Sequence, residues 1–169
     1  MKIAKIINNN VVSTCDEEGR EIIVMGRGVG FKAKEGSTID EEKVEKIFRL
    51  ESQNTMDKFK ELLENLPMEH VQISAEIIGY AKEVLNRPIN PNVYITLTDH
   101  INFALERYKQ KMMFSNPLIR EVRSFYHAEY LIGEYAIAMI ERDLGVKLPV
   151  DEAASIALHI VNAEYDAPM

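Results

Sequence analysis

Residues 21–31 read EIIVMGRGVGF, an apolar, largely β-branched run followed by three glycines that alternate with Arg27 and Val29. A dinucleotide-binding loop needs the pattern G-x-G-x-x-G at the start of a helix. Here the spacing is G-x-G-x-G, strand-like residues follow, and the chain has no Walker lysine pattern. Because glycine tolerates the positive φ of tight turns, the stretch predicts a strand and a hairpin turn, and it argues against a nucleotide site.

This turn belongs to a series of four short segments rich in β-branched residues, which predicts an antiparallel meander. Turn-forming residues at 8–10, 16–20 and 26–28 separate the segments. Apolar side chains occur on both faces of the strands. A sheet of about fifty residues cannot cover both faces itself, so a partner is expected, most simply a second copy of the chain. The predicted strands are residues 2–7, 11–15, 21–25 and 29–34.

The connectivity of a meander places its first and third turns at the same end of the sheet. Asn8, Asn10 and Arg27 should therefore share one end, while the acidic turn at 16–18 should lie at the other. Arginine can stack on bases or bind phosphate, and asparagine amides can read base edges. Phe31 fits either a core aromatic or a residue that stacks on an unpaired base. This end of the sheet is the candidate nucleic-acid site, although glycines that only shape a hairpin would give a similar pattern.

From residue 56 onward the pattern becomes helical, with apolar residues that recur every three or four positions, as in amphipathic helices of a bundle. A short helix at 41–49 and a linker at 49–57 are expected before it. The fold class is therefore α+β: a small four-stranded antiparallel β-sheet domain, followed by an all-α helical bundle. The expected domains are 1–55 and 56–169, and the expected helices are 56–66, 71–85, 93–108, 118–126, 131–145 and 151–164.

The composition favours a cytoplasmic protein without membrane insertion. Charged residues make up 28% of the chain, and no apolar run approaches the roughly 18 residues that a membrane span needs. The N-terminus lacks the apolar core of a signal peptide, and the single Cys15, expected in the core or at an edge, cannot form an internal disulfide. The net charge of −7 argues against sequence-blind binding of nucleic acid, but it does not exclude a small specific site.

Two ordered motifs, MKIAKIINNNVV at 1–12 and VMGRGVGF at 24–31, resemble the co-antiterminator (CAT) RNA-binding domain of the BglG/LicT/SacY family of transcriptional antiterminators. TDHINFALER at 98–107 and ALHIVNAE at 157–164 resemble the first regulation domain (PRD) of that family, which responds to the sugar phosphotransferase system (PTS). The resemblance, closest to LicT-type members, implies a non-enzymatic homodimer that stabilises an antiterminator RNA hairpin in nascent mRNA of a sugar operon, with β-glucosides as the expected sugars. The RNA-contacting positions that it implies are Lys5, Asn8, Asn10, Gly26, Arg27 and Phe31.

Two of the four histidines, His100 and His159, border apolar helical stripes, which by itself predicts buried core histidines. No zinc-type spacing is present, and no metal or cofactor is expected. The resemblance implies instead that PTS proteins, a sugar-specific enzyme II or HPr, phosphorylate both residues and so inhibit the protein when sugar is absent. Asp99 is expected to orient the His100 ring, while His70 and His127 are expected to be surface or capping residues.

Two other classes of protein fit part of this pattern. A phosphocarrier enzyme could use His100 and His159 as relays, but it would not need the turn rich in Asn, Gly and Arg. A dimerising scaffold would leave Arg27 free to vary. Family members normally carry a second regulation domain, which would begin where this sequence ends at NAEYDAPM, residues 162–169. An excised fragment and a naturally short form both fit that ending, so no activating phosphorylation site is assigned.

Overall fold

The structure is a computed structural model that describes residues 1–50, 52–112 and 115–165. The chain divides into two compact units, Met1–Met68 and Glu69–Met169, and each is described by itself. The predicted domain limits of 1–55 and 56–169 stay a prediction, since the first compact unit continues beyond the sheet through a helix. Among the residues that the structure describes, no helix is both long and apolar enough to cross a membrane.

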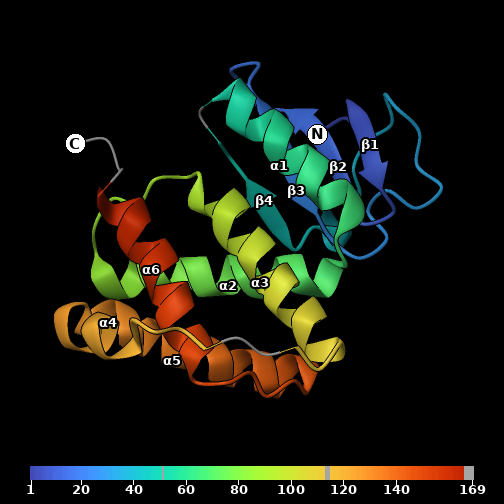
Figure 1. Cartoon of the computed structure of the whole chain (residues 1–169). Coiled ribbons are helices and arrows are strands. Elements are labelled where there is room, and N and C mark those ends of the chain that lie inside the picture. The colour runs from blue at the N-terminus through green and yellow to red at the C-terminus, as the bar shows by residue number, and fades with distance from the viewer. Residues whose placement is uncertain (51, 113–114, 166–169) are drawn as a thin grey trace. The chain divides into compact units, whose positions relative to one another are not determined.

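The first unit contains the predicted antiparallel meander, with its strands in sequence order (Figure 1). Strand pairing runs from Val11 opposite Met25 at one end to Cys15 opposite Glu21 at the other, and Cys15 is an exposed residue at the end of its strand. The strands are β1 (Lys5–Asn8), β2 (Val11–Cys15), β3 (Glu21–Met25) and β4 (Lys46–Phe48).

The fourth strand is not where the sequence predicts it. Residues 29–34 contain no strand, and residues 27–32 form successive turns, in which Val29 N–H donates to Gly26 O at 3.0 Å and Phe31 N–H donates to Gly28 O at 3.1 Å. Alternate glycines favour such turns over a strand, because they remove side chains that a strand would pack. The predicted helix at 41–49 is also wrong, since it contains a 3-10 turn, η1 (Glu41–Lys43), and then β4. Pairing of β4 with β3 outweighs the local preference of this short segment.

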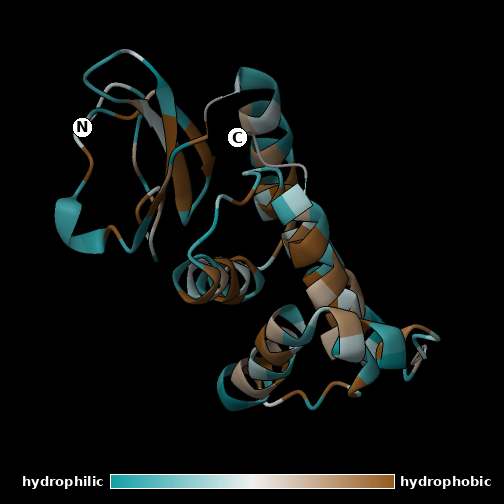
Figure 2. Cartoon of the chain, turned by 90° about the vertical axis from the view of Figure 1, so that its left-hand side faces the viewer, coloured by the Kyte–Doolittle hydropathy of each residue, from teal (hydrophilic) through white to brown (hydrophobic). Residues whose placement is uncertain are grey.

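Both faces of the sheet are covered by the chain itself. The long connection between β3 and β4 contributes Val29 and Ile39 to a buried cluster with Val12 and Val24 on one face. Helix α1 (Gln53–Asn65) packs against β1 and β3, and its Phe59 ring meets that of Phe48 edge-to-face, with centroids 4.9 Å apart. Figure 2 shows the strands as largely brown, hydrophobic ribbons that are bounded by mostly teal loops. The prediction that the sheet needs a second copy to cover its faces is therefore wrong, and dimerisation must rest on other grounds.

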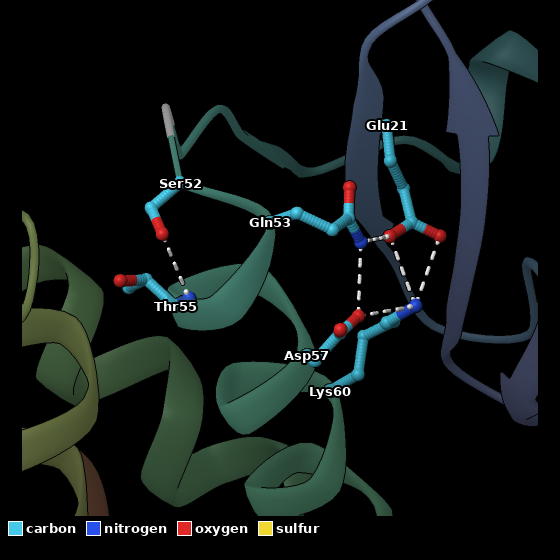
Figure 3. A network of polar contacts seen from close by, with 6 residues as sticks. All are labelled: Glu21, Ser52, Gln53, Thr55, Asp57 and Lys60. Carbon is cyan, nitrogen blue, oxygen red and sulfur yellow. Dashed lines mark hydrogen bonds and ion pairs between the residues drawn. The ribbon is translucent and has the colours of Figure 1, made fainter.

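Helix α1 begins four residues inside the region predicted as a linker, at a capping residue. The Ser52 hydroxyl accepts from Thr55 N–H at 3.4 Å, which satisfies one of the open donors of the first turn. Glu21 of β3 then accepts from Lys60 Nζ and from Gln53 Nε2, at 2.9 and 2.8 Å (Figure 3). The helix is thus attached to the sheet by polar contacts as well as by its apolar face.

The second unit is a helical bundle, and the predicted helices from 71 onward are confirmed. The tightest packing joins the last two long helices, where an added Cβ at Gly133 would collide with the Ala153 carbonyl group. The helix before the last loop ends at Gly145, whose φ of 69° is the left-handed conformation that glycine tolerates best. The helices are α2 (Met68–Leu85), α3 (Val93–Lys109), α4 (Ile119–Phe125), α5 (His127–Leu144) and α6 (Asp151–Tyr165).

Candidate functional sites

The asparagine turn and the glycine turn lie side by side at one end of the sheet, as the meander predicts. Backbone N–H groups of Gly26 and Gly30 donate to the carbonyl oxygens of Asn10 and Asn9, at 2.9 and 2.8 Å. The Gly28 N–H donates to the Asn10 side-chain oxygen at 2.9 Å. Two sequence motifs that are sixteen or more residues apart therefore form one hydrogen-bonded surface, here called the turn end. The acidic turn lies beyond Cys15, at the opposite end of the β2–β3 ladder.

Two glycines of the turn end lie where other backbone atoms of the same chain approach too closely for a side chain. An added Cβ at Gly26 would collide with the Lys43 carbonyl oxygen, and one at Gly30 would collide with the Asn8 carbonyl oxygen. Gly28 has a φ of 75°, which a side chain would strain. Gly26 and Gly30 are therefore required by the close approach of the chain's own backbone. Gly26 is buried, and a role in contacting RNA would have to use its backbone.

Asn8 has a structural role that sequence reasoning missed. Its side-chain oxygen accepts from Asn10 N–H at 2.8 Å, and its amide nitrogen donates to the Leu63 carbonyl oxygen of α1 at 3.2 Å. One side chain thus connects the turn end to the helix that covers the sheet. No local pattern identifies the Leu63 contact, because the two residues are 55 positions apart.

Three of the predicted contact residues, Lys5, Arg27 and Phe31, are exposed, whereas Asn10 is half-buried. Lys5 and Arg27 are accessible, and the Arg27 backbone N–H donates to the Glu45 carboxylate at 2.7 Å, which fixes the turn. The Phe31 side chain is 55% exposed, so the core alternative for this aromatic is wrong. Lys32, which the sequence did not single out, places its Nζ 5.4 Å from the Phe31 ring centroid. A cation beside an exposed ring is chemistry that suits stacking with a nucleobase and pairing with phosphate.

In the second unit, the structure brings together the two histidines that the sequence identified separately. His100 of α3 and His159 of α6 have ring centroids 4.7 Å apart and ring planes inclined by 42°. Burial, and next the neighbouring His100, lower the pKa of His159 to about 4. His159 is therefore neutral at pH 7. The two predicted phosphorylation sites form one composite site, here called the histidine pair.

Glu152 completes this site, although the sequence did not single it out. Its carboxylate lies 3.0 Å from His100 Nε2 and accepts from Arg107 at 2.9 Å. A signal was present, since Arg107 follows His100 by seven residues and Glu152 precedes His159 by seven, which is two turns along one helical face. The group at Nε2 of His100 is thus Glu152, whereas Asp99, predicted to orient the ring, is exposed.

The other two histidines differ from each other. His70 was expected at the surface, but its side chain is buried, and its Nδ1 lies 2.7 Å from the Asn102 side-chain oxygen. His127, the first residue of α5, is exposed as expected. Over residues 1–50, 52–112 and 115–165, no group of three or more His, Cys, Asp or Glu residues could hold a metal ion.

Comparison with known proteins identifies both units. The family model of the CAT RNA binding domain matches residues 1–57, and that of the PRD domain matches residues 75–163. The chain is 47% identical, over all its 169 residues, to the transcription antiterminator LicT of Bacillus subtilis (strain 168) and to the beta-glucoside operon antiterminator of Dickeya chrysanthemi. It covers 61% and 60% of those two proteins, and so spans about three fifths of their length.

A solved structure extends the similarity to the fold. The crystal structure of GlcT CAT-PRDI aligns with 98% of this chain and 98% of its own, with a TM-score of 0.84 and 34% sequence identity. The likeness therefore includes the four-stranded sheet and the helices that follow it.

Proposed function

This chain belongs to the BglG/LicT/SacY family, in which a CAT RNA binding domain is followed by a PRD domain, and on this premise we propose that it is a transcriptional antiterminator. It binds an RNA hairpin in nascent mRNA of a sugar operon, most simply one for β-glucosides, given its likeness to the antiterminator of such an operon. Holding that hairpin prevents the overlapping terminator from forming. The protein acts in the cytoplasm as a homodimer and a regulator, not as an enzyme.

The observation that carries this proposal is the turn end. Its backbone is fixed by hydrogen bonds between the two turns, while Arg27 and Phe31 stay exposed on it. A rigid backbone reduces the conformational entropy that is lost on binding, and an exposed aromatic beside cations suits unpaired bases in the internal loops of a hairpin. Lys5 of β1 is proposed to extend the contact along the edge of the sheet.

The histidine pair is proposed as the regulatory input. PTS proteins, HPr or a sugar-specific enzyme II, transfer a phosphoryl group to His100 or His159. That group adds roughly −1.5 to −2 charges at pH 7. It arrives at a largely buried position between α3 and α6, in a unit that carries most of the acidic excess of the chain. Repulsion between like charges and the cost of burying the phosphoryl group then weaken the packing of α3 on α6. As a result the dimer dissociates and the RNA is released.

Gel-shift titration with a short hairpin that contains internal loops tests the RNA site. Replacing Arg27→Ala should weaken binding by roughly 5- to 150-fold, because a charged contact to phosphate or a base is worth about 1–3 kcal/mol. Arg20→Ala is the matched control, since Arg20 is also exposed but lies at the opposite end of the sheet. Equal affinity of the Arg27 variant and the parent would remove the turn end from the RNA site.

The phosphocarrier alternative is favoured only by the histidine pair, because it gives the turn end no role. A carrier passes its phosphoryl group on to a second protein, whereas a regulator retains it until a phosphatase removes it. Incubation of the phosphorylated chain with unphosphorylated enzyme II distinguishes the two, through transfer that is rapid and stoichiometric in a carrier.

A further inference from the structure

Glu152 has both of its carboxylate oxygens engaged by side chains of α3. Oε2 lies 3.0 Å from His100 Nε2, and Oε1 accepts from Arg107 Nη2 at 2.9 Å. The side chains of His100, Arg107 and Glu152 are only 17%, 14% and 7% exposed, so water competes little for these contacts. Two such fixed partners hold the carboxylate in one orientation against the His100 ring.

This arrangement determines which ring nitrogen of His100 carries a hydrogen. A carboxylate paired with a guanidinium only accepts hydrogen bonds, so Nε2 of His100 must donate. In the neutral ring the other nitrogen, Nδ1, then has no hydrogen and carries the lone pair. The nucleophilic atom of His100 is accordingly Nδ1.

We propose that Glu152 is a positioning residue for the phosphorylation of His100, which it directs to Nδ1. The inference rests on the proposed function, because it concerns the same regulatory site. The Nδ1 lone pair attacks the phosphorus of the phosphoryl group carried by a side chain of the donor protein. A new N–P bond forms as the bond between phosphorus and the donor side chain breaks, and that electron pair returns to the donor. Nε2 keeps its hydrogen throughout, so no proton has to leave.

The same carboxylate stabilises the product. When Nδ1 bonds to phosphorus while Nε2 keeps its hydrogen, the His100 ring becomes positively charged. Glu152 then pairs with that charge, as a buried aspartate does with the imidazolium of a serine-protease triad. The adjacent His159 adds no opposing charge, since burial and His100 hold the pKa of His159 at about 4.

NMR of the full 169-residue chain with ¹⁵N-labelled histidine tests the first step without any donor protein. At pH 7 we expect the long-range ¹H–¹⁵N pattern of a ring with its hydrogen on Nε2 for His100. Glu152→Leu should change that pattern to a mixture of tautomers, whereas Glu134→Gln, a substitution at an exposed position of α5, should not. A hydrogen on Nδ1 in the parent, or an unchanged pattern in the Leu variant, would overturn the proposal.

Phosphoramidate, a small chemical donor, tests the second step. We expect ³¹P and ¹H–¹⁵N coupling to show phosphoryl on Nδ1 of His100 in the parent and on both nitrogens in Glu152→Leu. Exposed His127 is the internal reference that reacts in every variant, with sites assigned by mass spectrometry. Phosphoryl on Nε2 of His100 in the parent would overturn the proposal. Because these readouts need neither RNA nor PTS proteins, they can succeed even if the proposed antitermination fails, and the reverse also holds.

Glu152→Gln keeps the test decisive if the Leu variant does not fold. Glutamine retains an acceptor oxygen but loses the negative charge. The phosphorylated His100 ring should then release its Nε2 proton at a pH lower by about one unit or more, which a ³¹P titration measures. If the Glu152→Gln variant still carries phosphoryl on Nδ1 of His100 but titrates at this lower pH, Glu152 acts as a positioning residue and not only as a structural one. An unchanged midpoint would contradict the proposed charge stabilisation.

Discussion

The turn end and the histidine pair are built in opposite ways. At the turn end, backbone groups from two turns hold each other, and the side chains that could meet a ligand project from that frame. In the histidine pair, the contacts are made by side chains from two helices. His100 contacts Glu152 and His159, which are 52 and 59 residues away, in a largely buried cluster. Exposed side chains on a rigid frame can be exchanged at little cost to the fold. Buried side chains that support each other cannot, so ligand chemistry and stability are separable in the first site and coupled in the second.

The strongest test of this contrast is Gly26→Ala, which disturbs the frame of the turn end, that is, the hydrogen-bonded backbone of its two turns. A Cβ there would collide with the Lys43 carbonyl oxygen, which is backbone and cannot rotate away. We expect the first unit to lose about 2–4 kcal/mol of its free energy of unfolding, measured by urea denaturation. Gly79→Ala is the control, because a Cβ added at that position of α2 would have nothing within 4 Å, and it should be neutral or stabilising. A Gly26 variant as stable as the parent would show that the frame is not rigid.

The pH dependence of the second unit tests whether burial controls its titrating groups. His159 has its pKa lowered from 6.5 to about 4, so between these values the unfolded chain holds more protons and stability rises with pH. Burial, followed by a hydrogen bond to the Glu129 carboxyl group, raises the pKa of Glu164 from 4.5 to about 7. Between those values the folded chain holds more protons, so stability falls as pH rises. The two contributions oppose each other in the parent, and each amounts to at most about 3 kcal/mol.

Single substitutions separate these two contributions. In His159→Gln, the free energy of unfolding should only fall as pH rises from 4.5 to 7, because the Glu164 contribution remains. In Glu164→Gln, it should only rise as pH rises from 4 to 6.5, because the His159 contribution remains. Urea unfolding at intervals from about pH 4 to 8 measures both slopes, with the parent as the reference. Slopes of the same sign in the two variants would contradict the burial argument.

The smallest expected effect concerns Asn8, which is both a predicted RNA-contacting residue and part of the hydrogen-bonded frame. Asn8→Ala removes the hydrogen bond to the Leu63 carbonyl oxygen and leaves that group to find another partner. We expect a loss of about 1–2 kcal/mol in the stability of the first unit. Asn9→Ala, at an exposed position of the same turn, should change stability by less than about 0.5 kcal/mol. If both variants were equally stable, Asn8 would belong to the ligand surface alone.

The sequence predicted the elements whose pattern is long or strongly local. Helical periodicity located the bundle, and turn residues located the first three strands, since both signals arise within a few residues of chain. The fourth strand failed because Lys46–Phe48 is only three residues long and depends on its partner strand. Phe31 and His70 were misplaced or left open, because exposure depends on what the rest of the chain covers.

By itself, the sequence determined the meander, the helical bundle and the shared end of the two turns, and it singled out His100 and His159. Only the tertiary structure decided that α1 covers the sheet, that Asn8 reaches Leu63, and that His100, His159, Arg107 and Glu152 form one cluster. The physical reason is range. Turn preference and periodicity act between neighbours in the chain, whereas burial, ion pairing and the choice of a histidine tautomer depend on groups that only folding brings together.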